Sequence, residues 1–210
     1  MSSTLRVLQA LRSSLLLAGL VTWAASGQAQ VATSYNFAQS AGTYTEITGG
    51  TTLWGGFFGT FDNQVSSAQT IPSFNFDGTN YTQMYVSANG FITFGSAPSG
   101  TNFTPLSSAA SYAGAIAAFG ADIENRSSGL NTRDVRWQNV SGTIVIQWRN
   151  AARQGVNSEN FNAQIRLNTA NNSIEVVYGA LGSQGSSTTQ QPEVGLRGPD
   201  NTFGNNVNNR

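Results

Sequence analysis

Short runs of alternating apolar and polar residues, separated by glycine, asparagine and serine, dominate this chain of 210 residues. From Phe161 to Leu167 every second residue is apolar, and the same period resumes from Ile174 to Tyr178. A period of two places successive side chains on opposite faces of a β-strand, whereas an amphipathic helix needs a period near 3.6. The pattern therefore predicts a β-protein whose strands have one buried and one solvated face.

These two runs are predicted to form an antiparallel hairpin, because only six residues, which include the four-residue turn 169–172, separate them. Such a loop places Asn168 opposite Ser173 and brings Arg166 opposite Glu175 on the solvated face. A similar turn is predicted at Asn89-Gly90, where glycine accepts a positive φ.

The same alternation predicts further strands, with Trp137 and Trp148 pointing inward and Gln147 on the solvated face. These candidates are 35–38, 43–47, 71–76, 82–86, 91–94, 115–119, 134–138, 144–149 and 193–197. About ten or eleven short strands with polar turns are typical of a two-sheet antiparallel β-sandwich, of jelly-roll or lectin-like type.

An eight-stranded outer-membrane barrel is the main alternative, since it shares the alternation and the polar loops. Its strands need roughly 9 to 11 residues to cross the lipid. Most candidates here are shorter, and the chain ends on the polar run 205–210 rather than on an alternating strand. The sandwich is therefore the favoured fold.

The first 29 residues have the features of a secretory signal peptide. Arg6 and Arg12 form a basic region, 15–25 is apolar, and small residues follow at Gly27 and Ala29. The apolar run is well short of the ~20 residues that span a bilayer. We therefore predict a signal peptide (1–29), a β-sandwich domain (30–198) and a loose, Asn-rich tail (199–210), with the processed chain secreted and not inserted in a membrane.

The composition excludes many kinds of chemistry, because the chain has no His, no Cys and no Lys. These residues supply most nucleophiles, near-neutral bases and soft metal ligands. Removing the two leader arginines leaves 8 Arg against 10 acidic residues, a net charge of −2. Without clustered cations, nucleic acid is not an expected partner. No cofactor and no disulfide are predicted.

Several segments resemble a known group of bacterial surface proteins. They are YNFAQSAGTYTEITGGTTL from Tyr35, FDGTNYTQMYVSANGFITFG from Phe76, NFNAQIRLNTANNSIEVVYG from Asn160 and VGLRG from Val194. Together they resemble the N-terminal β-sandwich module of large secreted proteins exported by the type IX secretion pathway. YVSANGFITF followed by AIAAFGADIE is also similar to nidogen-like extracellular domains, although Gly120 stands where that pattern tends to place Trp.

This resemblance implies the fold and a surface location, and it implies no catalytic site. Members of the type IX group usually continue into further repeats and a C-terminal sorting domain. Because this sequence stops at Arg210, we expect a fragment or a truncated product of a longer surface protein.

Asp122 and Glu124 are the closest acidic pair in the sequence, and their spacing puts both on one face of a continuing strand. Two carboxylates are the minimum for a glycoside hydrolase, but neighbours on one strand cannot flank a glycosidic bond from both sides. With Asn125 and Asn131 they are also weak calcium candidates, although the repeating acidic pattern of a calcium loop is absent. We favour a structural role, paired with Arg126 or Arg133, and assign no metal.

A glycine-rich segment carries the candidate ligand site. Flat aromatic rings beside amide and carboxylate groups suit sugars and adhesive surfaces, although burial at the open end of the sandwich is the better expectation for any single ring. The candidate residues are Trp54, Phe57, Phe58, Phe61, Asp62 and Asn63.

These observations predict a secreted, non-catalytic binding or adhesion module at the cell surface, with glycans or a neighbouring surface component as partners. The alternatives are a carboxylate-based glycoside hydrolase and a structural spacer in a longer surface protein.

Overall fold

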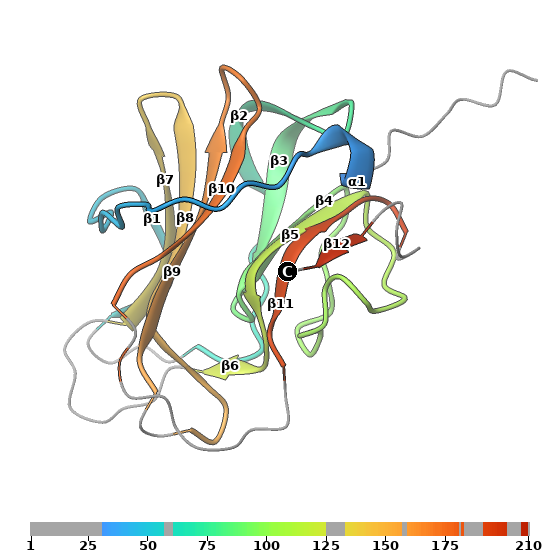
Figure 1. The fold of residues 1–210 in the computed structure, drawn as a ribbon. Coiled ribbons are helices and arrows are strands. Elements are labelled where there is room, and N and C mark those ends of the chain that lie inside the picture. Colours follow the sequence, from blue (N-terminus) through green and yellow to red (C-terminus); the bar gives the residue numbers. More distant parts are fainter. Residues whose placement is uncertain are drawn as a thin grey trace, which may run out of the picture.

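The computed structural model describes residues 31–56, 61–124, 133–156, 159–180, 182, 191–200 and 207–209. In this part of the chain, twelve strands form two six-stranded antiparallel sheets that face each other (Figure 1). The predicted β-sandwich is confirmed. A single four-residue helix, α1 (Val31–Ser34), is described in addition.

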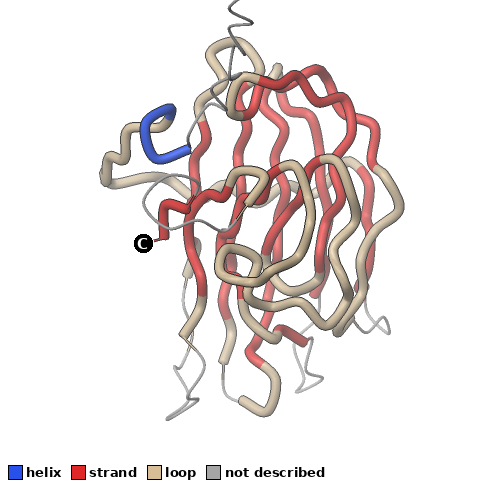
Figure 2. Tube along the Cα trace, turned by 90° about the vertical axis from the view of Figure 1, so that its right-hand side faces the viewer, coloured by secondary structure: helices blue, strands red, loops and turns tan. Residues whose placement is uncertain are grey.

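The first sheet has the order β1-β7-β8-β9-β10, with β6 paired to β8. Its strands are β1 (Thr51–Gly56), β6 (Ile123–Glu124), β7 (Arg133–Val140), β8 (Thr143–Arg153), β9 (Phe161–Asn168) and β10 (Ile174–Tyr178). The second sheet has the order β12-β11-β5-β4-β3-β2. Its strands are β2 (Gln69–Phe76), β3 (Thr79–Ser87), β4 (Phe91–Phe94), β5 (Gly114–Gly120), β11 (Glu193–Arg197) and β12 (Val207–Asn209). Figure 2 shows the molecule turned by 90°, with the second sheet facing the viewer and the first sheet behind it.

Strand prediction from periodicity is accurate where a strand alternates and is buried on one face. β4, β10 and β11 have the predicted bounds, and β2, β3, β5, β7, β8 and β9 extend the predicted ranges by one to a few residues. β1, β6 and β12 were not predicted, and β12 lies in the tail expected to be loose. The predicted strands 35–38 and 43–47 are not strands.

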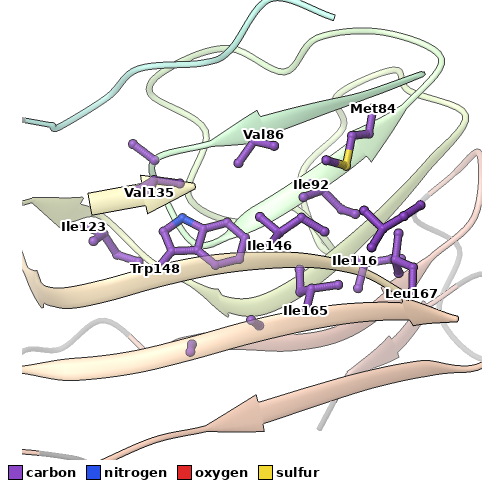
Figure 3. Close-up of a cluster of buried hydrophobic side chains, with 14 of the residues drawn as sticks. Met84, Val86, Ile92, Ile116, Ile123, Val135, Ile146, Trp148, Ile165 and Leu167 are labelled. Atoms are coloured by element: carbon purple, nitrogen blue, oxygen red, sulfur yellow. The ribbon is translucent and has the colours of Figure 1, made fainter. Parts of the chain in front are cut away.

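The core lies between the two sheets and takes side chains from the inner faces of both. Trp148 is fully buried, and Figure 3 shows it beside Ile123, Val135 and Ile146. Its indole Nε1 donates to the Ser87 carbonyl of the second sheet at 3.0 Å, so the ring joins the two layers. Trp137 is half-buried and packs against the same core.

The predicted hairpin is confirmed in its register. Arg166 pairs with Glu175 across β9 and β10, and the Asn168 amide donates to the Ser173 carbonyl at 3.0 Å. Arg166 Nη1 lies 3.9 Å from Glu175 Oε2. The turn at Asn89-Gly90 is also as predicted, with φ of 81° at Gly90.

Residues 42–49, called the strap below, run across the outer face of the first sheet instead of joining it as a strand (Figure 1, blue). Gln147 accepts from the Ile47 amide at 2.9 Å and donates to the Ile47 carbonyl at 3.2 Å. Gln164 donates to the Thr45 carbonyl at 2.8 Å. The side chains of the sheet therefore supply the hydrogen bonds that a neighbouring strand would otherwise provide.

The strap corrects the prediction that Gln147 lies on a solvated face. Gln147 and Gln164 point to the outer face, as alternation requires, yet both are fully buried. They are covered by the strap and bonded to each other at 2.8 Å. Buried amides of this kind are stable only because their hydrogen bonds are made.

Residues 96–113, called the cover loop below, lie over the outer face of the second sheet. Arg197, only 2% exposed, donates to the carbonyls of Ser108 at 2.8 Å and Ala110 at 2.6 Å. Glu193 accepts from the Leu106 amide at 2.7 Å. Leu106 itself packs with Phe91 and Ala117 in a small apolar cluster. Each sheet is thus covered on its outer side by the chain itself.

The described residues contain no helix that could cross a membrane. The only helix among the described residues is the four-residue α1, which is far too short to cross a bilayer.

Candidate functional site

A hollow of about 290 Å³ opens on the outer face of the first sheet, beside the strap. Its lining residues come from the strap, from β7 to β10 and from the turn between β9 and β10: Thr45, Ile47, Val140, Thr143, Val145, Gln164, Arg166, Asn168, Ser173 and Glu175. We call this hollow the outer groove. Ile47 and Val145 are buried, whereas Glu175 is exposed.

The groove is built from two rows of side chains that cross three strands. One row contains Val145, Arg166 and Glu175, which face one another in the β8-β9-β10 register. In the second row Thr143 is paired with Asn168, which is bonded to Ser173. Neighbouring strands lie roughly 4.8 Å apart, so these rows bring polar groups within reach of one small ligand.

Arg166 is held in one orientation by neutral partners. Its Nε and Nη2 donate to Gln164 Oε1 at 3.0 and 2.8 Å. Nη2 also donates to the Thr43 carbonyl of the strap at 3.0 Å. Nη1 is directed toward Glu175, at a separation too long for a direct hydrogen bond. The guanidinium is thus positioned before any ligand arrives.

A network of charged side chains from β7 and β8 also holds the strap against the outer face of the sheet. Glu46 of the strap pairs with Arg149, which lies 2.7 Å from Asp134 Oδ2. Arg136 donates to the same Asp134 oxygen at 3.0 Å and also to the Thr48 carbonyl. At the end of the strap Gly50 has φ of 77°, and a Cβ there would stand 2.3 Å from the Trp137 carbonyl oxygen. Only glycine fits this bend.

Only part of the predicted aromatic segment is exposed to solvent. Trp54 lies in β1, a strand that was not predicted, opposite Val135, and it is half-buried against the core. Phe61 is 1% exposed. Asp62 is half-buried and Asn63 is exposed. Phe57 and Phe58 lie outside the described residues, so ligand binding by this segment stays a prediction.

The structure brings Asp62 close to the acidic pair, although 60 residues of sequence separate them. Burial raises the pKa of Asp122, and the charges of Asp62 and Glu124 raise it further. Burial, followed by the Glu124 charge, also raises the pKa of Asp62. Glu124 Oε1 accepts from the Gly155 amide at 3.0 Å, which is a structural contact.

These carboxylates do not form a metal site in the described part of the chain, where no three acidic side chains are arranged to hold an ion. Asn125 and Asn131 lie outside the described residues. So does Arg126, one of the two expected partners of Asp122 and Glu124. The other, Arg133, is mostly buried, and its Nε and Nη1 have no hydrogen-bond partner.

Asn89 has a structural task. It is fully buried, and its Oδ1 accepts from the Ile123 amide at 3.0 Å while its Nδ2 donates to the Gly100 carbonyl at 2.9 Å. The side chain therefore ties β6 to the cover loop, beside the turn that the sequence predicted.

The outer groove was not predicted from the sequence. Arg166 and Glu175 were predicted as a cross-strand pair. Their neighbours in the groove, Thr45 and Ile47, come from a segment far away in the sequence. Thr45 is bonded to Gln164, for example, across 119 residues of sequence. The available signal was weak: a strand-like run, 43–47, whose pairing partner the sequence did not identify.

Comparison with known proteins agrees with this architecture. The family model described as NIDO related matches residues 34–210. The chain belongs to this family, and is accordingly an extracellular-type β-sandwich module. Searches of curated proteins and of solved structures found no match.

Proposed function

We propose that this chain is a secreted, non-catalytic binding or adhesion module that holds a glycan of a cell surface in the outer groove. The observation that carries the proposal is the separation of 3.9 Å between Arg166 Nη1 and Glu175 Oε2. A fixed donor and a nearby acceptor, both open to a hollow, suit a hydroxylated ligand.

The surrounding groups support this role. Thr143, Asn168 and Ser173 offer further hydroxyl and amide groups, and Val145 and Ile47 form an apolar floor. Sugars combine hydroxyl groups with apolar C–H faces, so a mixed surface of this kind complements them. The volume lies at the lower end of small-molecule sites, which are commonly ~300 to 1,000 Å³.

A glycan-array screen of the purified domain, followed by calorimetry on positive glycans, tests the proposal. In Thr143→Phe the added ring fills the groove at a position where an aromatic residue still suits a strand. We expect this variant to lose binding by at least about tenfold. Thr70→Phe, at an exposed position on β2 of the second sheet, is the matched control and should bind normally.

The non-catalytic part of the proposal has its own test. Bound oligosaccharide incubated with the wild type should release no new reducing ends, and Asp122→Asn with Glu124→Gln should bind as the wild type does. Hydrolysis that disappears in this double variant would instead support the carboxylate glycosidase. Binding to nothing on the array, with Thr143→Phe equal to the wild type in cell adhesion, would favour a structural spacer.

Secretion and the type IX assignment belong to the same proposal. They rest on the signal-like residues 1–29 and on the segments quoted above, and on the NIDO-related match. Expression with the native leader, followed by N-terminal sequencing of the exported protein, checks the first point. Loss of export in a host lacking type IX components checks the second.

A further inference from the structure

We infer that the ligand of the outer groove is a neutral sugar, recognised by two neighbouring hydroxyl groups that bridge Arg166 and Glu175. This inference rests on the proposed function and narrows it to a class of glycan. It also assigns the two residues separate roles, one as a hydrogen-bond donor and the other as an acceptor.

The spacing of the pair is the first argument. At 3.9 Å, Arg166 Nη1 and Glu175 Oε2 attract each other but do not share a hydrogen bond. Nη1 can therefore still donate, and the carboxylate can still accept. A hydroxyl group both accepts and donates, so one hydroxyl can take a proton from Nη1 while its neighbour gives one to Glu175.

The rigidity of Arg166 is the second argument. Arg166 donates from Nε and Nη2 to Gln164 Oε1, and Nη2 also donates to the Thr43 carbonyl. Gln164 is in turn fixed by Thr45 and Gln147. A donor held in this way loses little conformational freedom when a ligand binds, so more of the interaction appears as affinity.

The charge of the groove is the third argument, because it selects between neutral and acidic sugars. Arg166 and Glu175 carry opposite charges, and the other eight lining residues are uncharged. A sugar carboxylate that approached Arg166 would meet the Glu175 carboxylate a few ångströms away. Repulsion between like charges should therefore exclude uronic acids.

The size of the groove limits the ligand to about one or two sugar rings. The two rows of side chains span three strands, roughly 10 Å, in one direction and two same-face positions, roughly 7 Å, in the other. A longer glycan would extend past the exposed Val140 at the rim.

Calorimetry with matched oligosaccharides tests the inference. The probes are short oligomers of glucose, mannose and galactose, each compared with the oligomer of its own uronic acid. For the wild type we expect one or more neutral oligomers to bind at least about fivefold more tightly than their uronates, because a sugar carboxylate and Glu175 would lie a few ångströms apart, well within one Debye length.

Glu175→Ala should reverse this preference. Loss of the acceptor should weaken neutral binding by roughly tenfold, as expected for one charge-assisted hydrogen bond. Loss of the negative charge should strengthen uronate binding, because Arg166 then faces the carboxylate alone. Asp200→Ala makes the same change in net charge at an exposed position after β11, and should leave the preference unchanged.

The outcomes separate this inference from the proposed function. If Thr143→Phe abolishes glycan binding but Glu175→Ala leaves the ratio of neutral to acidic binding as in the wild type, the groove binds glycans and the inference is wrong. A wild type that prefers uronates also overturns it. If neither variant changes binding, the groove is not the site and both fail. Circular dichroism and a thermal melt of each variant establish that it is folded.

Discussion

The strap and the cover loop each cover the outer face of one sheet, but different sets of side chains hold them in place. The cover loop is anchored mainly by Glu193 and Arg197, two charged residues of β11 that are both less than 10% exposed, with the neutral Asn89 as a further tie at Gly100. The strap is anchored by one or two side chains from each of β7, β8 and β9, namely the amides of Gln147 and Gln164 and the guanidinium groups of Arg136, Arg149 and Arg166.

This difference in anchoring should determine how easily each cover opens. Removing Arg197 leaves the part-buried carbonyls of Ser108 and Ala110 without this donor, while the Pro105 carbonyl keeps its bond from the Tyr112 hydroxyl. Each anchor of the strap serves one or two groups, several of them near solvent. We therefore expect the cover loop to behave as part of the core, and the strap to be the more easily opened cover, beside the groove that it borders.

The largest expected effect comes from the core that lies beneath both covers. Trp148→Ala removes a fully buried ring and its bond to Ser87, and should lower the free energy of unfolding by about 3 to 5 kcal/mol. Urea denaturation measures it. A midpoint within error of the wild type would show that the strap and the loop, and not the core, dominate stability.

Arg197→Met tests the cover loop. It keeps the length of the side chain but removes the donors and the contact of the guanidinium with the Tyr112 ring, whose centroid lies 4.5 Å away. We expect a loss of about 2 to 4 kcal/mol, since buried acceptors are left unsatisfied. A loss no larger than that of the strap variant described next would remove the proposed difference between the covers.

Gln147→Leu tests the strap. Leucine matches the volume approximately but leaves the Ile47 amide and carbonyl without partners, so a loss of about 1 to 3 kcal/mol is expected. Limited proteolysis should also cut this variant within residues 42–49 before it cuts the cover loop. Stability equal to the wild type would mean that the face is solvated, as alternation alone suggested.

The smallest effect on stability is expected at the groove. Glu175→Gln removes a partly exposed ion pair that should contribute about 0.2 to 1 kcal/mol. A larger loss in thermal or urea denaturation would indicate that Glu175 stabilises the fold, which would weaken its assignment to ligand binding.

Periodicity could predict the sheets but not what covers them. Strands such as β9 and β10 alternate between apolar and polar residues, and this local pattern predicts their bounds to within one residue. The sequence correctly placed Gln147 on the outer face, yet could not show that Ile47, 100 residues earlier, lies on it. The run 43–47 has the alternation of a strand, but side chains of the first sheet, and not a neighbouring strand, bond its backbone.

The candidate site, too, could be predicted only where it depends on local register. Arg166 opposite Glu175 follows from local register, whereas the hollow around them depends on the strap. In the same way, Asp62 approaches Asp122 and Glu124 only through the fold. Contacts between distant segments leave little trace in a single sequence when they are made by polar side chains with backbone groups.

An NMR titration tests the central claim that the outer groove of the first sheet, and not the covered face of the second sheet, binds the ligand. A neutral oligosaccharide selected on the array would be added to the isotopically labelled domain. The account predicts that the amide resonances of Thr143, Val145, Arg166, Asn168 and Glu175 shift together with those of the strap, while residues 96–113 do not move. Shifts confined to the cover loop, or to Trp54 and Asn63, would contradict it.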